Sequence, residues 1–391
     1  MSLPNKQIPV LLVPLIVAPY RINGHRLPYL STNRQTLALE SRLRSAYNGK
    51  TTVVAKSIFY RISLVLLKTS LTTMYYVAVF LLLTTNSLFA QGRELTPDRV
   101  NQRVQLAAVE VLVNGRLSGS GAVIDRDGIV LTAAHVANAR DITIEVLLAN
   151  KIRLPATVYG KDASHDILLL RLPEKEGGYN AIPLARKLPL VGSNAFLVGS
   201  PLFRHRLLFT GTVAQSTISA EFLNPHYVEV FYIQSASPHG TSGGAWVNGH
   251  GQLIGLQSAM LFVNNSPQGI AFVAPLSAIK HLLDHPHTIS VASAGFAVEE
   301  LWEQPPNYLQ QLTDGATGVV IKVIIPGSPL EKAQIPIGTI VTSIDDKPIQ
   351  TRDAYVAAIR AHKPGDEVIL KVRTPNNKAE REISFKLGSL Q

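Results

Sequence analysis

Between residues 104 and 275 the chain alternates short apolar runs with glycine, proline and other turn residues. Representative runs read LAAVEVLV, GIVLTAAHV, DILLLRL, NAFLVGS, VEVFYIQ and GIAFVAP. Many short strands at near-regular spacing, with no amphipathic helix between them, are typical of an all-β barrel or sandwich. The first helix that the pattern predicts is Leu276–Asp284, which closes this β segment.

After a polar stretch, DHPHTISVAS, the pattern changes to a mixture of strands and helices. A segment of this length can form a small α+β domain. We therefore expect a β domain over 93–284, a linker over 285–292 and an α+β domain over 293–391. In the last domain the predicted elements are strands near 318–325, 340–344 and 367–374 and a helix near 352–361.

Residues 1–92 form a basic leader before these domains. They carry ten Lys or Arg side chains and one acid, Glu40, so their net charge is +9, and only +1 of the chain's +10 remains for 93–391. Within the leader, 69–92 is uncharged. Its apolar centre, MYYVAVFLLL, has the length of a signal-peptide core and is short for a membrane span of about 20 apolar residues. We expect a signal peptide or membrane anchor at about 69–90, with cleavage after Ala90 in the first case.

The place of this segment leaves two interpretations of the leader. Export to the periplasm or cell envelope is the main prediction, although a signal peptide normally begins the chain and this one follows a long extension. That extension is rich in arginine and poor in acids, which also fits an organelle transit peptide. Targeting to an organelle therefore stays the alternative.

Composition and charge exclude several classes of function. The chain has no cysteine, which excludes disulfide scaffolds, thiolate metal sites and cysteine nucleophiles. Because the excess positive charge belongs to the leader, nucleic-acid binding by the domains is not expected. His281, His285 and His287 have no carboxylate cluster beside them, so no metal is expected. The chain contains no phosphate-binding loop, and no cofactor is expected.

Three residues at strand edges of the β domain could perform acyl transfer. His135 follows a strand in LTAAHV, Asp166 precedes one in SHDILLL, and Ser242 lies in the glycine-rich GTSGGA. Acyl transfer to water needs a hydroxyl nucleophile, an imidazole to remove its proton, and a carboxylate to fix the tautomer of that imidazole. The order His, Asp, Ser on β segments therefore predicts a catalytic triad.

The glycines around Ser242 predict the second part of such a site. A tetrahedral intermediate carries negative charge on the former carbonyl oxygen, and backbone N–H groups aimed at it form an oxyanion hole. Gly240, two residues before the nucleophile, allows a turn tight enough to point its own amide and that of Ser242 inward. We expect these two amides to form the oxyanion hole.

At this point the residues resemble a known family. LTAAHV, SHDILLL and HGTSGGAWVNGHGQLIGLQSA are similar to the three catalytic blocks of the HtrA-type trypsin-like serine proteases. The resemblance covers about 104–388, since GVVIKVIIPGSPLEKAQIPIGTIVTSIDDKPIQTRDAYVAAI resembles the PDZ domain that follows the protease in that family. It implies an all-β, chymotrypsin-like pair of six-stranded barrels followed by an α+β PDZ domain. His135 would be the general base, Asp166 its orienting acid and Ser242 the nucleophile.

The PDZ resemblance also implies a peptide-binding site. Such a domain adds an extended peptide as a strand to the edge of its sheet, while backbone amides hold the terminal carboxylate. Gly295, Phe296, Ala297 and Val298 resemble the carboxylate loop and the strand after it, with Ala297 in place of a common glycine. We expect C-terminal peptides to bind there.

Together these features predict an ATP-independent serine endopeptidase that degrades misfolded or unfolded proteins of the cell envelope, with a PDZ domain for peptide recognition or regulation. The family resemblance implies a homotrimer. The alternative is a catalytically impaired homologue that acts as a chaperone or peptide-binding scaffold. That alternative would hold if Thr241 or His239, which depart from the family pattern beside Ser242, collapse the oxyanion loop.

Overall fold

The computed structural model describes residues 94–139, 141–223 and 225–390. They belong to one compact unit, Arg93–Gln391. The basic leader and the expected signal peptide or anchor lie outside the described residues. Within these ranges, no helix is both long and apolar enough to cross a membrane.

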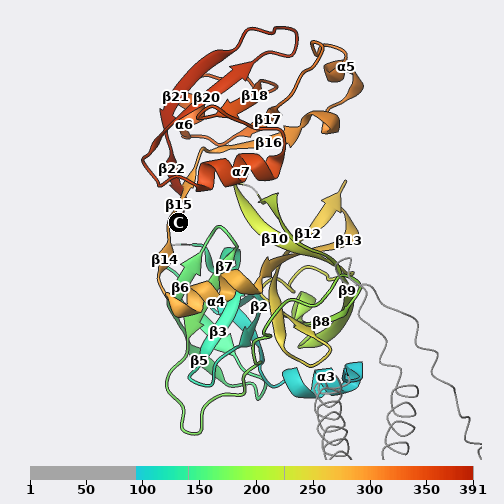
Figure 1. The fold of residues 1–391 in the computed structure, drawn as a ribbon. Helices are drawn as coiled ribbons and strands as arrows, with labels where there is room; N and C mark the ends of the chain where they lie inside the picture. Colours follow the sequence, from blue (N-terminus) through green and yellow to red (C-terminus); the bar gives the residue numbers. More distant parts are fainter. Residues whose placement is uncertain (1–93, 140, 224, 391) are drawn as a thin grey trace, which may run out of the picture. The chain divides into compact units, whose positions relative to one another are not determined.

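The first half of the β domain is an eight-stranded sheet in the order β14-β6-β7-β3-β2-β1-β4-β5 (Figure 1). The central strand β3 reads IVLTA and is buried at every position, as expected for a strand covered on both faces. The strands are β1 Ala108–Val113, β2 Arg116–Val123, β3 Ile129–Ala133, β4 Ile144–Leu147, β5 Arg153–Pro155, β6 Thr157–Asp162, β7 Ile167–Arg171 and β14 Thr288–Ile289.

The second half is a closed six-stranded barrel in the order β10-β13-β12-β11-β8-β9. Every neighbouring pair in it is antiparallel. Its strands are β8 Asn194–Gly199, β9 Leu207–Leu223, β10 His226–Gln234, β11 Ala245–Asn248, β12 Leu253–Val263 and β13 Ser266–Pro275.

One of the two expected six-stranded barrels is thus present, whereas the first half stays an open sheet. Its strands β5 and β6 are consecutive in the chain and are joined by Ala156, whose N–H donates to the Ile144 carbonyl at 2.9 Å. The chain therefore pairs first with β4 and then bends to pair with β7. No ladder of hydrogen bonds forms between β5 and β6, because two strands joined by a single residue cannot turn back on each other.

Two helices flank the β domain. α4, Leu276–Asp284, has the predicted bounds and buries Leu276, Ile279 and Leu282 on one face. α3, Pro97–Val104, was not predicted, because its sequence PDRVNQRV offers only Val100 and Val104 for burial. The first N–H group of a helix has no acceptor within the helix, so proline, which lacks this group, is well suited to the first position of α3.

The C-terminal domain has the predicted α+β character. Its six-stranded sheet has the order β16-β17-β18-β20-β21, with β19 paired to β18, so β16 is an edge strand. The predicted strands and helix appear as β17, β18, β20 and α7. The elements are β15 Val291–Ser293, β16 Phe296–Glu300, α5 Pro306–Leu309, β17 Val319–Ile324, α6 Pro329–Lys332, β18 Ile340–Ile344, β19 Lys347–Pro348, α7 Arg352–Arg360, β20 Glu367–Arg373, β21 Arg381–Lys386 and β22 Gly388–Leu390.

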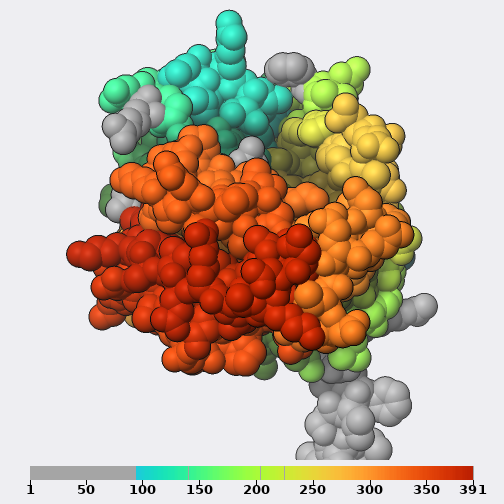
Figure 2. Space-filling model, turned by 90° about the horizontal axis from the view of Figure 1, so that it is seen from above, coloured from blue at the N-terminus to red at the C-terminus, as the bar shows by residue number. Residues whose placement is uncertain are grey.

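The hairpin formed by β9 and β10 packs against this C-terminal domain. Ala220 and Tyr227 of the hairpin share a hydrophobic cluster with Phe296 and Tyr355. The Asp353 carboxylate at the start of α7 accepts the Ala220 N–H at 2.7 Å. In Figure 2, residues of the C-terminal domain, in orange and red, cover the centre of the near face, with residues of the β domain in teal and yellow beside them. The segment predicted as a linker also forms β14, which extends the eight-stranded sheet, and the start of β15, which pairs with β22 in a separate two-stranded sheet.

Candidate active site

Strand pairing brings His135 and Asp166 together. His135 lies in the short 3-10 helix Ala134–Ala137 directly after β3, and Asp166 lies in the turn directly before β7. β3 and β7 are antiparallel neighbours, and Ala133 is opposite Ile167. The end of one strand therefore meets the start of the other, which makes two residues that are distant in sequence adjacent in space.

The His135–Asp166 contact consists of two hydrogen bonds. His135 Nδ1 lies 2.7 Å from one carboxylate oxygen of Asp166, and the His135 backbone N–H donates to the other at 2.9 Å. Asp166 is 5% exposed and has φ of +56°, a left-handed conformation that costs energy for a residue with a side chain. The turn is therefore held in a disfavoured conformation, and its carboxylate faces the imidazole.

This contact changes the titration of His135. Burial of the imidazole opposes its charged form, but the hydrogen bond that His135 Nδ1 donates to Asp166 and the negative charge of that carboxylate together outweigh it, so the pKa of His135 is raised above 6.5. A carboxylate on Nδ1 also selects the tautomer that leaves Nε2 free to accept a proton.

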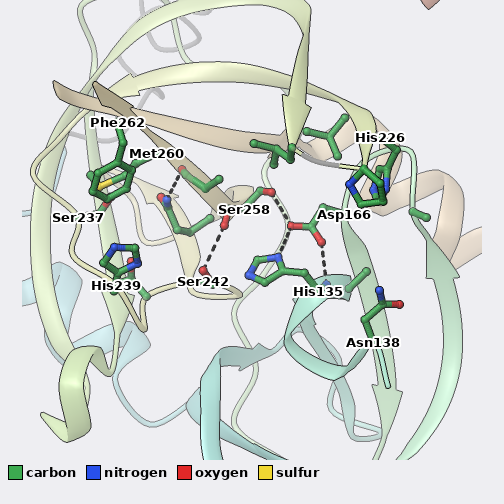
Figure 3. Close-up of a pocket in the computed structure, with 18 of the residues that line it drawn as sticks. His135, Asn138, Asp166, His226, Ser237, His239, Ser242, Ser258, Met260 and Phe262 are labelled. Atoms are coloured by element: carbon green, nitrogen blue, oxygen red, sulfur yellow. Dashed lines mark hydrogen bonds and ion pairs between the residues drawn. The ribbon is translucent and has the colours of Figure 1, made fainter. Parts of the chain in front are cut away.

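Ser242 lies beside this pair, together with a residue that the sequence analysis missed. Ser242 and His135 line the same cleft (Figure 3). The Ser242 hydroxyl donates to the Ser258 carbonyl at 3.2 Å, and the buried Ser258 hydroxyl donates to Asp166 at 2.5 Å. Ser258 thus contacts two of the three predicted residues. Its only signal in the sequence is a polar residue inside the apolar strand LIGLQSAM.

Two glycines and Ser120 fix the conformation of the loop around Ser242. Gly240 has φ of +91° and Gly243 has φ of +84°, which favour glycine. The Ser120 hydroxyl donates to the Gly240 carbonyl at 2.8 Å, and the Ser120 N–H donates to the Ser242 carbonyl at 2.8 Å. In the described ranges, the N–H groups of Gly240 and Ser242 have no hydrogen-bond acceptor. Two free amides therefore remain beside the serine, as an oxyanion hole requires.

A cleft of about 470 Å³ opens over these groups. His135, Asp166 and Ser242 lie along it, as do apolar side chains that include Met260 and Phe262. The His239 ring stacks on the Phe262 ring with centroids 5.0 Å apart, so His239 points to the cleft wall. In the part of the chain that the structure describes, no group of three or more His, Asp or Glu residues could hold a metal ion.

The four residues predicted to bind a peptide lie at the free edge of the C-terminal sheet. Gly295 precedes edge strand β16, which contains the other three. Tyr227 of the β domain contacts this edge: its hydroxyl accepts the Val298 N–H at 2.7 Å and donates to the Val298 carbonyl at 3.1 Å. The Tyr355 hydroxyl of α7 donates to the Phe296 carbonyl at 2.9 Å. Backbone groups that an added strand would use are thus already paired.

The space between α7 and β16 is also filled. A cavity of only about 30 Å³ remains there. The Tyr227 ring packs edge-on against Tyr355 with centroids 5.8 Å apart, and against Phe222 at 5.3 Å. The side chains that line the cavity therefore come from both domains. In this conformation the Tyr227 and Phe222 side chains of the hairpin fill the space between α7 and β16.

Comparisons of sequence match two separate segments of the chain to known families. Residues 119–256 match the trypsin-like peptidase domain family, and residues 296–387 match the PDZ domain family. The serine protease PepD of Mycobacterium tuberculosis is 29% identical over 294 residues, which cover 70% of this chain and 61% of PepD. The serine endoprotease DegS of Escherichia coli K12 is 29% identical over 69% of this chain and 77% of its own length.

A third relative is matched over about half of its own length, and a solved structure shares the fold. The periplasmic serine endoprotease DegP of Escherichia coli K12 is 29% identical, and the match covers 64% of this chain and 53% of DegP. A structure of the HtrA-type protease AlgW with a decapeptide has a TM-score of 0.54 at 18% identity and covers 76% of this chain and 99% of that one. The chain therefore combines a trypsin-like peptidase domain with a PDZ domain, and in sequence and fold it is similar to serine endoproteases of the HtrA type.

Proposed function

We propose that Ser242, His135 and Asp166 are the catalytic triad of this protease. The carrying observation is the His135 Nδ1–Asp166 hydrogen bond of 2.7 Å at the wall of the cleft that Ser242 also lines. The Ser242 hydroxyl now donates to the Ser258 carbonyl, so it reacts after a rotation about its χ1 angle toward His135 Nε2. Such a rotation between staggered conformers is fast compared with turnover.

The reaction follows from these positions. His135 Nε2 takes the hydroxyl proton while the Ser242 oxygen attacks the substrate carbonyl, and the free amides of Gly240 and Ser242 stabilise the resulting oxyanion. His135 then gives the proton to the leaving amine, which breaks the peptide bond and leaves an acyl-enzyme. In the second half, His135 takes a proton from water while the water oxygen attacks the ester carbonyl. The bond between the acyl carbon and the Ser242 oxygen then breaks, His135 returns the proton to Ser242, and the peptide leaves with a new carboxyl end.

The unpaired N–H groups of Gly240 and Ser242 support activity over the alternative of an impaired homologue. Thr241 donates to the Pro238 carbonyl through its hydroxyl at 2.7 Å, and His239 stacks on Phe262. The side chains of Thr241 and His239, which depart from the family pattern, therefore have partners other than the N–H groups of Gly240 and Ser242.

Covalent labelling tests this proposal. A fluorophosphonate probe should label the full chain at Ser242, and Ser242→Ala should abolish labelling and lower peptide cleavage by several orders of magnitude. His135→Ala should do the same, while the folded state of each variant is checked by circular dichroism. A folded wild-type protein that is not labelled would support the chaperone or scaffold alternative.

For substrates and location, we propose an ATP-independent endopeptidase that acts on unfolded or misfolded proteins of the cell envelope. The cleft has an apolar wall suited to side chains that folded proteins bury. The relatives are named as serine proteases or endoproteases, and DegP is named as periplasmic. Export through a signal peptide or membrane anchor at about 69–90, and assembly as a homotrimer, complete the proposal.

For the PDZ domain, we propose that C-terminal peptides bind along β16 once the β9–β10 hairpin has left it. The support is the edge position of β16 and the pairing of Val298 by Tyr227, which imitates the hydrogen bonds of an added strand. Free peptide and hairpin then compete for the same backbone groups.

A further inference from the structure

The turn that presents the catalytic aspartate is held from outside by two other elements. Its residues are Asp162, Ser164, His165 and Asp166. From within, Asp162 accepts the Ser164 N–H at 2.9 Å and contacts His165 Nδ1 at 2.7 Å. From outside, the Ser164 carbonyl accepts the backbone N–H of Glu229 on β10 at 2.9 Å. The conformation of Ser164 thus depends on β10 as well as on its own turn.

A side chain of the PDZ domain joins this arrangement. Arg360, in the last turn of α7, places both terminal guanidinium nitrogens 3.4 Å from the Ser164 carbonyl. It also donates to the Tyr227 carbonyl at 2.7 Å and forms an ion pair with the Glu229 carboxylate. Its side chain is only 14% exposed. All of its contacts across the domain boundary therefore converge on the aspartate turn and on the part of β10 that holds it.

The contact of residue 360 with both Ser164 and Glu229 requires the geometry of an arginine side chain. A planar guanidinium can serve a carbonyl and a carboxylate at the same time, which an ammonium cannot do with the same geometry. Because the cation is mostly buried, its removal also leaves Glu229 without its partner beside the turn. Glu229 Oε2 lies 3.6 Å from His165 Nε2, so a change in Glu229 reaches the residue next to Asp166.

We propose that Arg360 is a positioning residue for catalysis: the PDZ helix holds the Ser164 carbonyl and thereby the orientation of Asp166 toward His135. This inference rests on the triad proposed above. It assigns to a PDZ residue an effect on the chemical step, and not only on the capture of peptides.

The opposite end of α7 offers a matched control. Arg352 also reaches the hairpin, since its Nη1 lies 3.7 Å from Glu221, and within its own domain its Nη2 lies 2.7 Å from Glu303; its side chain is 24% exposed. None of its contacts involves the aspartate turn. Arg352→Ala therefore removes a charge from the same helix and the same domain boundary without touching Ser164.

The test is cleavage of a short chromogenic peptide by the full chain and its variants. Arg360→Ala should lower kcat by about tenfold or more with little change in KM, because a small misplacement of a catalytic group affects the transition state more than substrate binding. Arg360→Lys, which keeps the charge, should recover part of kcat. Arg352→Ala should stay within about twofold of the wild type.

A spectroscopic signal separates positioning from general loosening. The proton between His135 Nδ1 and Asp166 gives a downfield NMR signal, which Arg360→Ala should shift or broaden and Arg352→Ala should leave in place. The proposal is overturned if Arg360→Ala keeps kcat and this signal, or if Arg352→Ala lowers kcat equally. If Arg360→Ala does not fold, Arg360→Lys is the test. An unchanged kcat and an unchanged NMR signal in Arg360→Lys would then overturn the proposal. Wild-type labelling at Ser242 is measured in parallel, so that failure of the triad itself is recognised separately.

Discussion

Removal of one hydroxyl group should open the PDZ groove. Tyr227→Phe deletes both hydrogen bonds to the Val298 backbone and keeps the ring contacts with Phe222 and Tyr355. Each hydrogen bond contributes about 1 kcal/mol net, so the docked hairpin should lose about 2 kcal/mol. Unpaired Val298 groups disfavour the docked state further, because buried backbone groups need partners.

This loss converts directly into peptide affinity. When the docked state dominates, the apparent Kd is the intrinsic Kd divided by the fraction of open groove. A change of about 2 kcal/mol should therefore tighten peptide binding by roughly thirtyfold. The expected increase is large enough to separate it from the scatter of a binding assay.

Fluorescence anisotropy with a labelled peptide that ends in a free carboxylate measures this affinity. Ser242→Ala serves as the background, so that the peptide is not cleaved. Tyr232→Phe is the matched control, since Tyr232 lies on the same strand and donates to Glu221 instead of the PDZ edge. The amidated peptide should bind more weakly, because it lacks the charge-assisted hydrogen bonds of the carboxylate. Equal affinities in Tyr227→Phe, Tyr232→Phe and the parent would refute the idea that Tyr227 blocks the groove.

Two further predictions concern the catalytic site. Since the pKa of His135 is raised above 6.5 and the neutral imidazole is the base, kcat/KM should rise with pH through a midpoint above 6.5 and then level off; a profile that is flat across this range in folded protein would contradict it. By linkage, the His135–Asp166 pair contributes its full stabilisation of the fold at pH values below the pKa that His135 has in the unfolded chain. This contribution is lost as pH rises through the raised pKa of His135 in the folded protein. Gly243→Ala should abolish labelling of Ser242, because φ is +84° there and an added Cβ would collide with the Ser120 carbonyl oxygen. The control Gly192→Ala should keep the labelling, since φ is a similar +87° but nothing lies near the added Cβ. Labelling of Gly243→Ala would show that this turn is not required.

Local patterns predicted the elements of this chain well, because each is encoded by its own residues. α4 has the predicted bounds, and α7 ends one residue before the predicted helix end. The open first sheet could not be predicted, because the choice between a ladder and a bend at Ala156 depends on where β4 and β7 lie. α3 was missed for the opposite reason: its two buried residues give little periodicity, and its burial comes from the tertiary structure.

The candidate site shows the same limit. His135, Asp166 and Ser242 were predicted from motifs and order, and the structure brings them to one cleft. Ser258 escaped notice, because a hydroxyl inside an apolar strand becomes meaningful only when the fold brings β12 to Asp166, to which Ser258 donates a hydrogen bond. Arg360 is 196 positions from Ser164 in the chain, and no periodicity or motif relates residues at such a separation.

The two inter-domain contacts also share one residue. Tyr227 uses its side-chain hydroxyl at the peptide edge, while its backbone carbonyl accepts a hydrogen bond from Arg360. A peptide that takes the Val298 backbone groups has to displace this tyrosine, and its displacement removes one of the acceptors that fix Arg360. Under the two proposals above, the docked hairpin therefore holds the aspartate turn through Arg360 and blocks the groove, whereas the displaced hairpin opens the groove and releases the turn. Coupling between them requires no change elsewhere in the barrel, because the shared element contacts both sites directly.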